Sequence, residues 1–452
     1  MKKIMCITLI VFLLPVLGIF AGGSQEGQSD DKTVVNVWTR NRHDKDLMVR
    51  QVEKFNQNEG KEKGIEIDYQ IYGDDFIDIY TIAFESGNGP DIMNLEESIS
   101  AGVNKGVIQP LTSFDNEGWV ENFPFDVDIN NVTAYQGEVY SIPQFAFTMR
   151  MVYNKDLFEA VGLDPEKPPR TYEDIVEYAK VITDKSGGKK FGVALPFKWG
   201  EGFWTWAGTY TVGGGFGRRE FDYAEGKFDF SPLKPYTEMI VQLKKDKSLF
   251  PGAEGLDNDT ARAQFAEGNV GMMFAVSWDV AVFNDQFPVK IDMGITEVPV
   301  PEETGFKYKS ELVSQGEWWL GSDIPDEKKK AVWEVYKWLN SDGIVTMKYE
   351  AAKNIPVNPT IAKNAKAPDV MGFAEFSDVT NNKVYPVVPS VRVEGDTFDV
   401  IFYNAVAGEY SVDEAVERAN KAYNAALEQA INEGALEISD YRIQDYKPTL
   451  AE

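Results

Sequence analysis

Residues 33–95 alternate between strand-like and helix-like segments, and this alternation limits the possible folds more than any other feature of the chain. The β-branched run TVVNVW (33–38) predicts a strand. Met48, Val52 and Phe55 follow at helical spacing. The pattern then repeats with a strand at 65–71, a helix through Phe76, Ile79, Tyr80 and Ala83, and a strand at 90–95. Short connections between such segments predict a right-handed parallel βαβαβ unit.

Ligands of parallel sheets bind at the carboxyl ends of the strands. The loops after Val37, Ile71 and Leu95 are therefore the first places to expect a binding site.

The second half of the chain continues in the same style. Thr171 and Asp174 predict the capping box of a helix over 171–182, and NVGMMFAV (269–276) predicts a strand. Further helices are expected over 327–340 and from Ser411 to Gly434. With 452 residues the chain is long enough for two or three domains. We therefore predict an α/β protein built from two lobes.

Charge and composition exclude several classes of protein. The formal net charge is −27, which opposes binding to nucleic acid and to anionic membrane surfaces. The chain has one cysteine, Cys6, and one histidine, His43. This excludes a disulfide framework, a Cys/His zinc site and every catalytic triad that needs both a nucleophilic cysteine and a histidine. His43 could serve as a general base, but beside Arg42 and Asp44 we interpret it as a solvated loop residue.

The first residues have the composition of a secretory signal peptide. Lys2 and Lys3 precede an apolar run over 4–20, and the small residues AGGS follow. We expect cleavage after Ala21 or Gly23, and we expect no lipid anchor because no cysteine stands at the cut. This places the mature protein in the periplasm, with residues 22–32 as a mobile leader. An uncleaved membrane anchor is the alternative.

A search for catalytic motifs is mostly negative. The sequence contains no P-loop, no G-x-S-x-G and no H-E-x-x-H, and GGGFG (213–217) lacks the third glycine of a dinucleotide fingerprint. We therefore expect no cofactor and no metal. A pair of carboxylates of the kind used by glycosidases stays open, because only their separation in space decides it.

Tryptophan residues stand where the predicted strands end. Trp38, Trp278 and Trp318 each occupy such a position, whereas Trp333 and Trp338 lie on a helix and are expected in the core. An aromatic ring covers the flat C–H face of a sugar, and polar neighbours such as Arg40, Glu317 and Asp279 can bond its hydroxyls. The pattern favours a sugar site over a phosphate site, for which only Arg40 and Arg42 cluster.

Nearly the whole chain after the leader resembles family 1 of the extracellular solute-binding proteins, which includes maltose-binding protein. The resemblance lies in the shared order and spacing of several segments: VVNVW (34–38), GNGPDIM (87–93), QGEVYSIPQFAFTMRMVYNKDLFEAVGL (136–163), PRTYEDI (169–175), AQFAEGNVGMMFAVSWD (263–279), QGEWWLGS (315–322), KKKAVWEVYKWLNS (328–341) and IPVNP (355–359).

The resemblance implies a two-lobed periplasmic binding protein fold of type II, with a mostly parallel, helix-flanked sheet in each lobe and a hinge between them. It implies an ABC importer subunit that delivers a sugar or oligosaccharide to permease subunits without performing chemistry. By position it adds site residues to those inferred from the strand ends: Glu97, Ser98, Gln144, Phe147, Phe203, Trp204 and, again, Trp278.

We expect the first lobe to hold residues 33–145 and 292–325 and the second to hold 148–290 and 328–452. The boundary follows from GITEV (294–298), which resembles a strand returning to the first lobe. A monomer is expected. Two alternatives remain: a secreted glycoside hydrolase, and a chemoreceptor-coupled or adhesive binding protein of the same fold.

Overall fold

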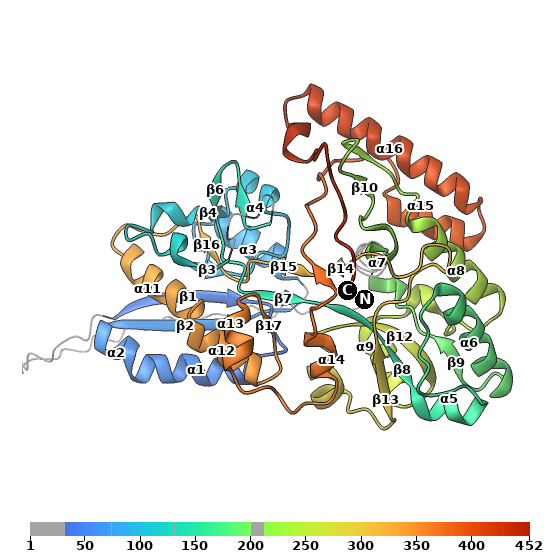
Figure 1. Ribbon diagram of the computed structural model, residues 1–452. Helices are drawn as coiled ribbons and strands as arrows, with labels where there is room; N and C mark the ends of the chain where they lie inside the picture. Colours follow the sequence, from blue (N-terminus) through green and yellow to red (C-terminus); the bar gives the residue numbers. More distant parts are fainter. Residues whose placement is uncertain (1–31, 74, 126, 128, 130–131, 200–211) are drawn as a thin grey trace, which may run out of the picture.

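The described part of the chain folds into two lobes joined by a small sheet (Figure 1). The structure, a computed structural model, describes residues 32–73, 75–125, 127, 129, 132–199 and 212–452. The predicted signal peptide (1–21) and all of the leader except Lys32 lie outside these residues.

The first lobe is organised around a five-stranded sheet in the order β2-β1-β3-β16-β4. β1 is parallel to β2 and β3, as the βαβαβ pattern predicts, whereas β16 is antiparallel to β3 and β4. The strands are β1 (Thr33–Thr39), β2 (Ile65–Ile71), β3 (Ile92–Met93), β4 (Ile108–Gln109) and β16 (Trp319–Gly321).

The longer helices cover this sheet because they present a stripe of apolar residues to it. Met48, Val52 and Phe55 of α1 are buried against Val35 and Val37 of β1, as their spacing predicts. The helices of this lobe are α1 (Lys45–Gln57), α2 (Glu59–Lys63), α3 (Phe76–Glu85), α4 (Ile99–Lys105), α11 (Lys329–Leu339) and α12 (Asp342–Glu350), with a hairpin of β5 (Ala134–Tyr135) and β6 (Glu138–Val139).

The second lobe contains a four-stranded sheet in the order β13-β8-β12-β9. β12 is parallel to β9, but β8 is antiparallel to both β12 and β13, so this sheet is mixed rather than mostly parallel. The reason is that β8 directly follows β7 (Phe145–Phe147) of the small sheet that joins the lobes, so the chain direction of β8 points away from that sheet. The strands are β8 (Met149–Asn154), β9 (Phe191–Val193), β12 (Val270–Val276) and β13 (Met293–Thr296).

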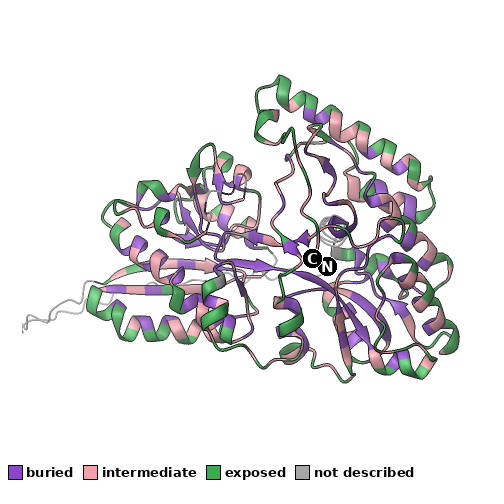
Figure 2. Cartoon of the chain, viewed as in Figure 1, coloured by how far each residue is buried: buried purple, intermediate pink, exposed green. Residues whose placement is uncertain are grey.

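The second lobe is larger and carries most of the C-terminal part of the chain (Figure 1). Its helices are α5 (Lys155–Val161), α6 (Tyr172–Lys185), α7 (Gly213–Phe216), α8 (Leu233–Lys245), α9 (Asn258–Ala266), α10 (Asp279–Ala281), α14 (Phe373–Ser377), α15 (Phe398–Ala407) and α16 (Val412–Asn432). Short paired strands complete it: β10 (Phe221–Asp222) with β11 (Lys227–Phe228), and β14 (Ser310–Glu311) with β18 (Asn382–Lys383). Figure 2 shows buried residues concentrated in the sheets and exposed residues on the outer faces of the helices.

A three-stranded antiparallel sheet in the order β15-β7-β17 joins the lobes. Its strands are β7 (Phe145–Phe147), β15 (Val313–Gln315) and β17 (Ile355–Pro356), and α13 (Pro359–Asn364) follows β17. A small cluster of Phe145, Val345 and Ile361 is buried there. We call this three-stranded sheet the hinge sheet.

The structure differs from the predicted lobe boundaries in two places. β13 pairs with β8 and β14 pairs with β18 in the second lobe, so residues 293–296 and 310–311 do not belong to the first lobe. Conversely, α11 and α12 pack in the core of the first lobe, where Val332, Val335 and Leu339 of α11 are fully buried and Ile344 of α12 is buried beside them. Both predictions were wrong because the choice of lobe depends on long-range pairing, and the local pattern of a strand or helix does not encode its partner.

Candidate functional site

The carboxyl ends of the central strands of both sheets adjoin the hinge sheet. β8 begins at Met149, two residues after β7 ends at Phe147, and β16 begins at Trp319, four residues after β15 ends at Gln315. Both strands therefore start at the edge where their antiparallel neighbours end. The loops after β1 and β3 gather at the edge of the first lobe's sheet, which we call the first edge. The loops after β9 and β12 gather at the edge of the second lobe's sheet, which we call the second edge. Such edges are where α/β sheets bind ligands.

Asn94 connects three loops at the edge of the first lobe. It follows β3, and its side-chain oxygen accepts hydrogen bonds from the Thr39 hydroxyl (2.5 Å) and from the backbone N–H of Arg40 (2.9 Å). Its amide nitrogen donates to the carbonyl oxygen of Glu317 (2.6 Å). The loops after β1 and β3 and the loop before β16 are thus held together by one buried amide.

A buried cluster of charged residues lies beside Asn94. The Lys348 Nζ of α12 is 2.8 Å from Asp44 Oδ2 and 2.6 Å from Glu317 Oε1. Lys348 has no exposed surface, and the Glu317 side chain is 8% exposed. Asn41 Nδ2 also donates to Glu317 Oε1 (2.7 Å). Two carboxylates therefore share one ammonium group beneath the surface of this edge.

The surroundings shift the pKa values of these groups in different directions. Burial alone would raise the pKa of Asp44, but the charges of Lys348, His43 and Lys353 and the hydrogen bond from Lys348 together outweigh it and hold the pKa below its usual range. Burial raises the pKa of Glu317 in spite of Lys348, and Asp44 adds to the rise. Burial would lower the pKa of Lys348, yet the two carboxylates raise it. Lys348 is therefore charged at neutral pH.

The edge of the second lobe is aromatic and largely apolar. Trp278 follows β12 and is partly buried, and its ring centre lies 4.9 Å from that of Phe147 in β7, with the planes tilted by 57°. The preceding Ser277 N–H donates to the carbonyl oxygen of Thr148, between β7 and β8 (3.0 Å). The loop that carries Trp278 is thus attached directly to the hinge.

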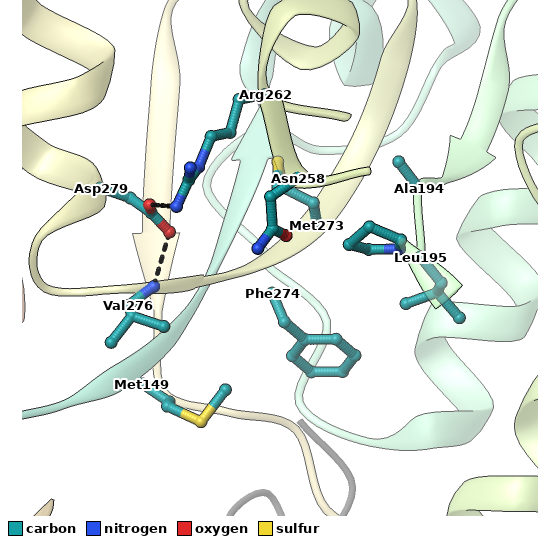
Figure 3. A pocket seen from close by; sticks show the side chains of 10 residues that line it. Met149, Ala194, Leu195, Asn258, Arg262, Met273, Phe274, Val276 and Asp279 are labelled. Carbon is teal, nitrogen blue, oxygen red and sulfur yellow. Dashed lines mark hydrogen bonds and ion pairs between the residues drawn. The ribbon is translucent and has the colours of Figure 1, made fainter. Parts of the chain in front are cut away.

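A cavity of about 20 Å³ lies at this edge, between the ends of β9 and β12 and the start of α9 (Figure 3). Asp279 borders it, and both of its carboxylate oxygens are engaged: Arg262 donates to one, and the Val276 N–H donates to the other (2.9 Å). The volume suits about one water molecule. The lining residues are Met149, Ala194, Leu195, Pro196, Asn258, Arg262, Met273, Phe274, Val276 and Asp279.

Four of the site residues predicted from sequence lie at the first edge, and the polar groups of three of them, Arg40, Glu97 and Ser98, are already paired. Arg40 forms an ion pair with Glu96 (2.8 Å), and Glu97 forms one with Lys105 (2.6 Å) and accepts from the Tyr80 hydroxyl (2.8 Å). Ser98 is exposed and caps α4 by accepting from the Ala101 N–H. Trp38 is partly buried against Tyr72, at a ring distance of 4.9 Å.

Two predicted site residues are buried away from any ligand surface. Trp318 is fully buried in the core of the first lobe, so its predicted role in stacking on a ligand is wrong. β16 lies in the interior of the sheet and is covered on both faces, which buries Trp318 on one face and Trp319 on the other. Gln144 is 1% exposed and donates to the carbonyl oxygen of Asn340, which makes it part of the hinge.

Of the remaining predicted residues, the structure brings Phe147, Trp278 and Asp279 together at the second edge and Glu317 into the charged cluster of the first. Phe203 and Trp204 lie outside the described residues. Sequence reasoning missed Asn41, Asn94, Lys348 and Arg262. Asn94 directly follows the strand PDIM, which is the one signal that could have identified it.

Among the described residues, no helix combines the length and the apolar composition that crossing a bilayer requires. In the same part of the chain, no group of three or more His, Cys, Asp or Glu side chains is placed to hold a metal ion.

Sequence comparison gives relatives that span most of the chain. The sn-glycerol-3-phosphate-binding periplasmic protein UgpB of Brucella melitensis is 24% identical over 410 residues, which cover 84% of this chain and 90% of that protein. The protein of the same name from Escherichia coli K12 is 26% identical over 249 residues, which cover 53% of this chain and 54% of that protein.

Solved structures of similar fold align with this chain over nearly their whole length. The cyclic α-maltosyl-1,6-maltose binding protein of Arthrobacter globiformis aligns with a TM-score of 0.65 and 20% identity, over 88% of this chain and 100% of that one. The GacH receptor of Streptomyces glaucescens aligns with a TM-score of 0.68 and 20% identity, over 88% and 99%. These likenesses confirm the two-lobed binding-protein fold.

The family model of the bacterial extracellular solute-binding proteins matches residues 46–345. This range begins in α1 and ends in α12, so it includes the sheet of the second lobe, all strands of the first lobe's sheet except β1, and the strands β7 and β15 of the hinge. The chain belongs to the family of bacterial extracellular solute-binding proteins.

Proposed function

We propose that this protein is the substrate-binding component of an ABC importer and that it captures a neutral carbohydrate between its two lobes. The observation that carries the proposal is the pairing of two unlike edges beside one hinge. The first edge offers polar groups on ordered loops, and the second offers the partly buried ring of Trp278. Sugars combine flat apolar faces with hydroxyl groups and therefore need both kinds of surface.

A sugar phosphate is the second candidate, because the relatives that align over most of the chain are named as glycerol-3-phosphate-binding proteins. A phosphate site requires cationic groups whose charge is available to the ligand. Arg40 lies against Glu96, and Arg262 lies against Asp279 and Asp259. Residues 200–211, which are outside the described part, contain no Lys or Arg. The pairing of these arginines with carboxylates therefore favours a neutral sugar over a sugar phosphate as the ligand.

The proposal includes the finer details of location and partners. The chain would be exported by its signal peptide, cut after Ala21 or Gly23, and would work as a periplasmic monomer that docks on two permease subunits. N-terminal sequencing of the secreted protein tests the position of the cut.

An enzymatic role finds less support. A glycosidase would need two accessible carboxyl groups about 5–10 Å apart. At the first edge Glu96, Glu97 and Glu317 are each paired with a cation. Lack of turnover of aryl glycosides would agree with a binding protein, and measurable turnover would favour the hydrolase. A chemoreceptor-coupled role would be supported instead if no permease genes lie beside the gene.

A ligand panel tests the proposal. Maltotriose, raffinose and sn-glycerol 3-phosphate are added to the protein in thermal melts, and hits are measured by calorimetry at low and high salt. A ligand at 100 times its Kd adds about 2.7 kcal/mol of stability. We expect stabilisation by a neutral sugar with an affinity that does not depend on salt. Binding of sn-glycerol 3-phosphate alone, weakened by salt, would support the second candidate and overturn the first.

A further inference from the structure

The charged cluster of Lys348, Asp44 and Glu317 is unusual because burying its three charges costs free energy. Moving an ammonium group and two carboxylates out of water costs several kcal/mol for each ion, and such clusters can often be replaced by apolar residues without loss of stability. Net stabilisation therefore does not explain why this cluster is present. Its position gives a better explanation.

The cluster connects the loops after β1 and β3 with the loop before β16. Asp44 lies in the loop between β1 and α1, and its carbonyl oxygen accepts from the N–H groups of Leu47 and Met48 in the first turn of α1 (3.0 and 2.9 Å). Glu317 precedes β16, binds Asn41 through its side chain and Asn94 through its carbonyl oxygen. Lys348 joins Asp44 to Glu317 and so closes the network.

The cluster also reaches the hinge sheet. Lys348 Nζ lies 4.9 Å from the centre of the Phe145 ring, in β7, and 5.7 Å from that of Trp318. His43 Nε2 lies 3.3 Å from Oδ1 of Asn354, the residue before β17. Lys348 belongs to α12, which continues into β17 through residues 351–354. The loops of the first edge are therefore attached to two of the three hinge strands.

We propose that Lys348 is a positioning residue of the ligand site: through Asp44 and Glu317 it fixes the loops after β1 and β3 and couples them to the hinge strands β7 and β17. This inference rests on the proposed function, since it assumes that the first edge contacts the ligand. Lys348 itself does not touch the ligand, because it has no exposed surface.

The first lobe offers a matched control for Lys348. Lys328 Nζ lies 2.6 Å from Asp91 Oδ2, and the Asp91 side chain is 6% exposed. Asp91 precedes β3, whereas Asn94 follows it, so this second ion pair lies at the opposite end of the strand from the ligand site. Lys328→Met therefore removes a lysine from a buried carboxylate without disturbing the first edge.

The experiment measures hydrogen exchange and ligand affinity in the mature protein. We expect Lys348→Met to speed hydrogen exchange at residues 40–44, 94–97 and 316–318 and to leave exchange in the second lobe unchanged. We also expect it to weaken ligand binding about 10-fold or more, as the loss of a supporting residue behind the ligands does at metal sites. Lys328→Met should leave both quantities as in the wild type. The binding probe is maltotriose or sn-glycerol 3-phosphate, whichever the wild-type protein binds.

Lys348→Met could fail to fold, because it leaves two carboxylates facing one another. The double variant Lys348→Met/Asp44→Asn removes one charge of each sign, and it is expected to fold and still show faster exchange in the three loops. Unchanged exchange in these loops, or equally faster exchange after Lys328→Met, would overturn the inference. If the wild-type protein binds neither probe, the proposed ligand class fails while the exchange measurement still decides the role of Lys348.

Discussion

The two edges beside the hinge are built from different interactions. The first edge is held by buried hydrogen bonds and ion pairs that meet at Asn94, Glu317 and Lys348. The second is held by the aromatic contact between Trp278 and Phe147 and by apolar residues around a small cavity. Directional bonds fix the position of polar groups, whereas an aromatic ring provides contact area with little loss of conformational freedom. We infer that the first edge determines which hydroxyls are recognised and that the second supplies most of the binding energy.

The largest expected effect comes from breaking the charged cluster of the first edge. Lys348→Met leaves Asp44 and Glu317 buried without their cation, and removal of one partner from a buried ion pair costs about 3–5 kcal/mol. Chemical denaturation should show this loss in the free energy of unfolding. Lys328→Met is the control and should lose less, because Lys328 is 20% exposed. Equal losses in the two variants would remove the distinction between the charged cluster and an ordinary ion pair.

The second prediction distinguishes a loss of ligand affinity from a loss of folding stability at Trp278 and Trp318. Trp278→Ala should remove ~2–4 kcal/mol of binding, roughly 30- to 900-fold in affinity, with a smaller loss of stability because the ring is partly exposed. Trp318→Ala should instead cost ~3–5 kcal/mol of stability, because Trp318 is fully buried. Calorimetry and thermal melts on both variants provide the measurement. A Trp278→Ala protein that binds as tightly as the wild type would contradict the role given to the second edge.

The third prediction concerns pH, to which the two lobes should respond in opposite directions. Burial raises the pKa of Glu311, in β14 of the second lobe, to about 7 although Arg219 lies 3.3 Å away, and Glu220 contributes to the rise. The folded state therefore holds this proton more tightly than the unfolded state does. The associated stability is fully present below the unfolded pKa of about 4.5 and is lost as the pH rises to about 7.

Glu311→Gln removes this dependence. At pH 8 the variant should be more stable than the wild type, by no more than about 3 kcal/mol, and at pH 4 the two should agree. Denaturation across this range measures the difference. Asp44 in the first lobe has a lowered pKa, so its contribution is present at neutral pH and is lost as the solution becomes more acidic than its folded pKa. A wild-type profile that does not fall between pH 4.5 and 7 relative to Glu311→Gln would contradict the third prediction.

The smallest effect is expected at two helix caps, one in each lobe. Ser98 accepts from the Ala101 N–H at the start of α4, and Thr171 forms a capping box with Asp174 at the start of α6. Ser98→Ala and Thr171→Ala should each cost about 1 kcal/mol of stability. Only Ser98→Ala should also weaken ligand binding, because Ser98 lies at the first edge. Equal affinities in both variants would limit Ser98 to its capping role.

The sequence predicted local structure well wherever it depends on nearby residues. The capping box of Thr171, the buried stripe of α1 and the cap of α16 at Ser411 are all confirmed, because each follows from spacing over a few positions. Partners that are distant in the chain could not be predicted in the same way. Lys348 resembles any surface lysine in sequence, and only residues distant in the chain, such as Phe145 and Trp318, bury it.

The same limit explains the errors at Trp318 and β13. The sequence pattern places Trp318 at the end of a strand, where a site is expected, but Trp318 directly precedes β16, which lies between β3 and β4 and is covered on both faces. β13 resembles a strand returning to the first lobe, yet its partner β8 lies in the second. In both cases the decisive information is the order of strands in the sheet, which local patterns do not contain.

Small-angle scattering of the mature protein, with and without saturating ligand, tests most directly whether the two edges act on one ligand. Two lobes joined by three short strands can close by bending at the hinge sheet. We expect the radius of gyration to fall when the bound sugar draws the edges together, and to fall less in Trp278→Ala at the same ligand concentration. An unchanged radius at a concentration that calorimetry shows to be saturating would contradict binding between the lobes.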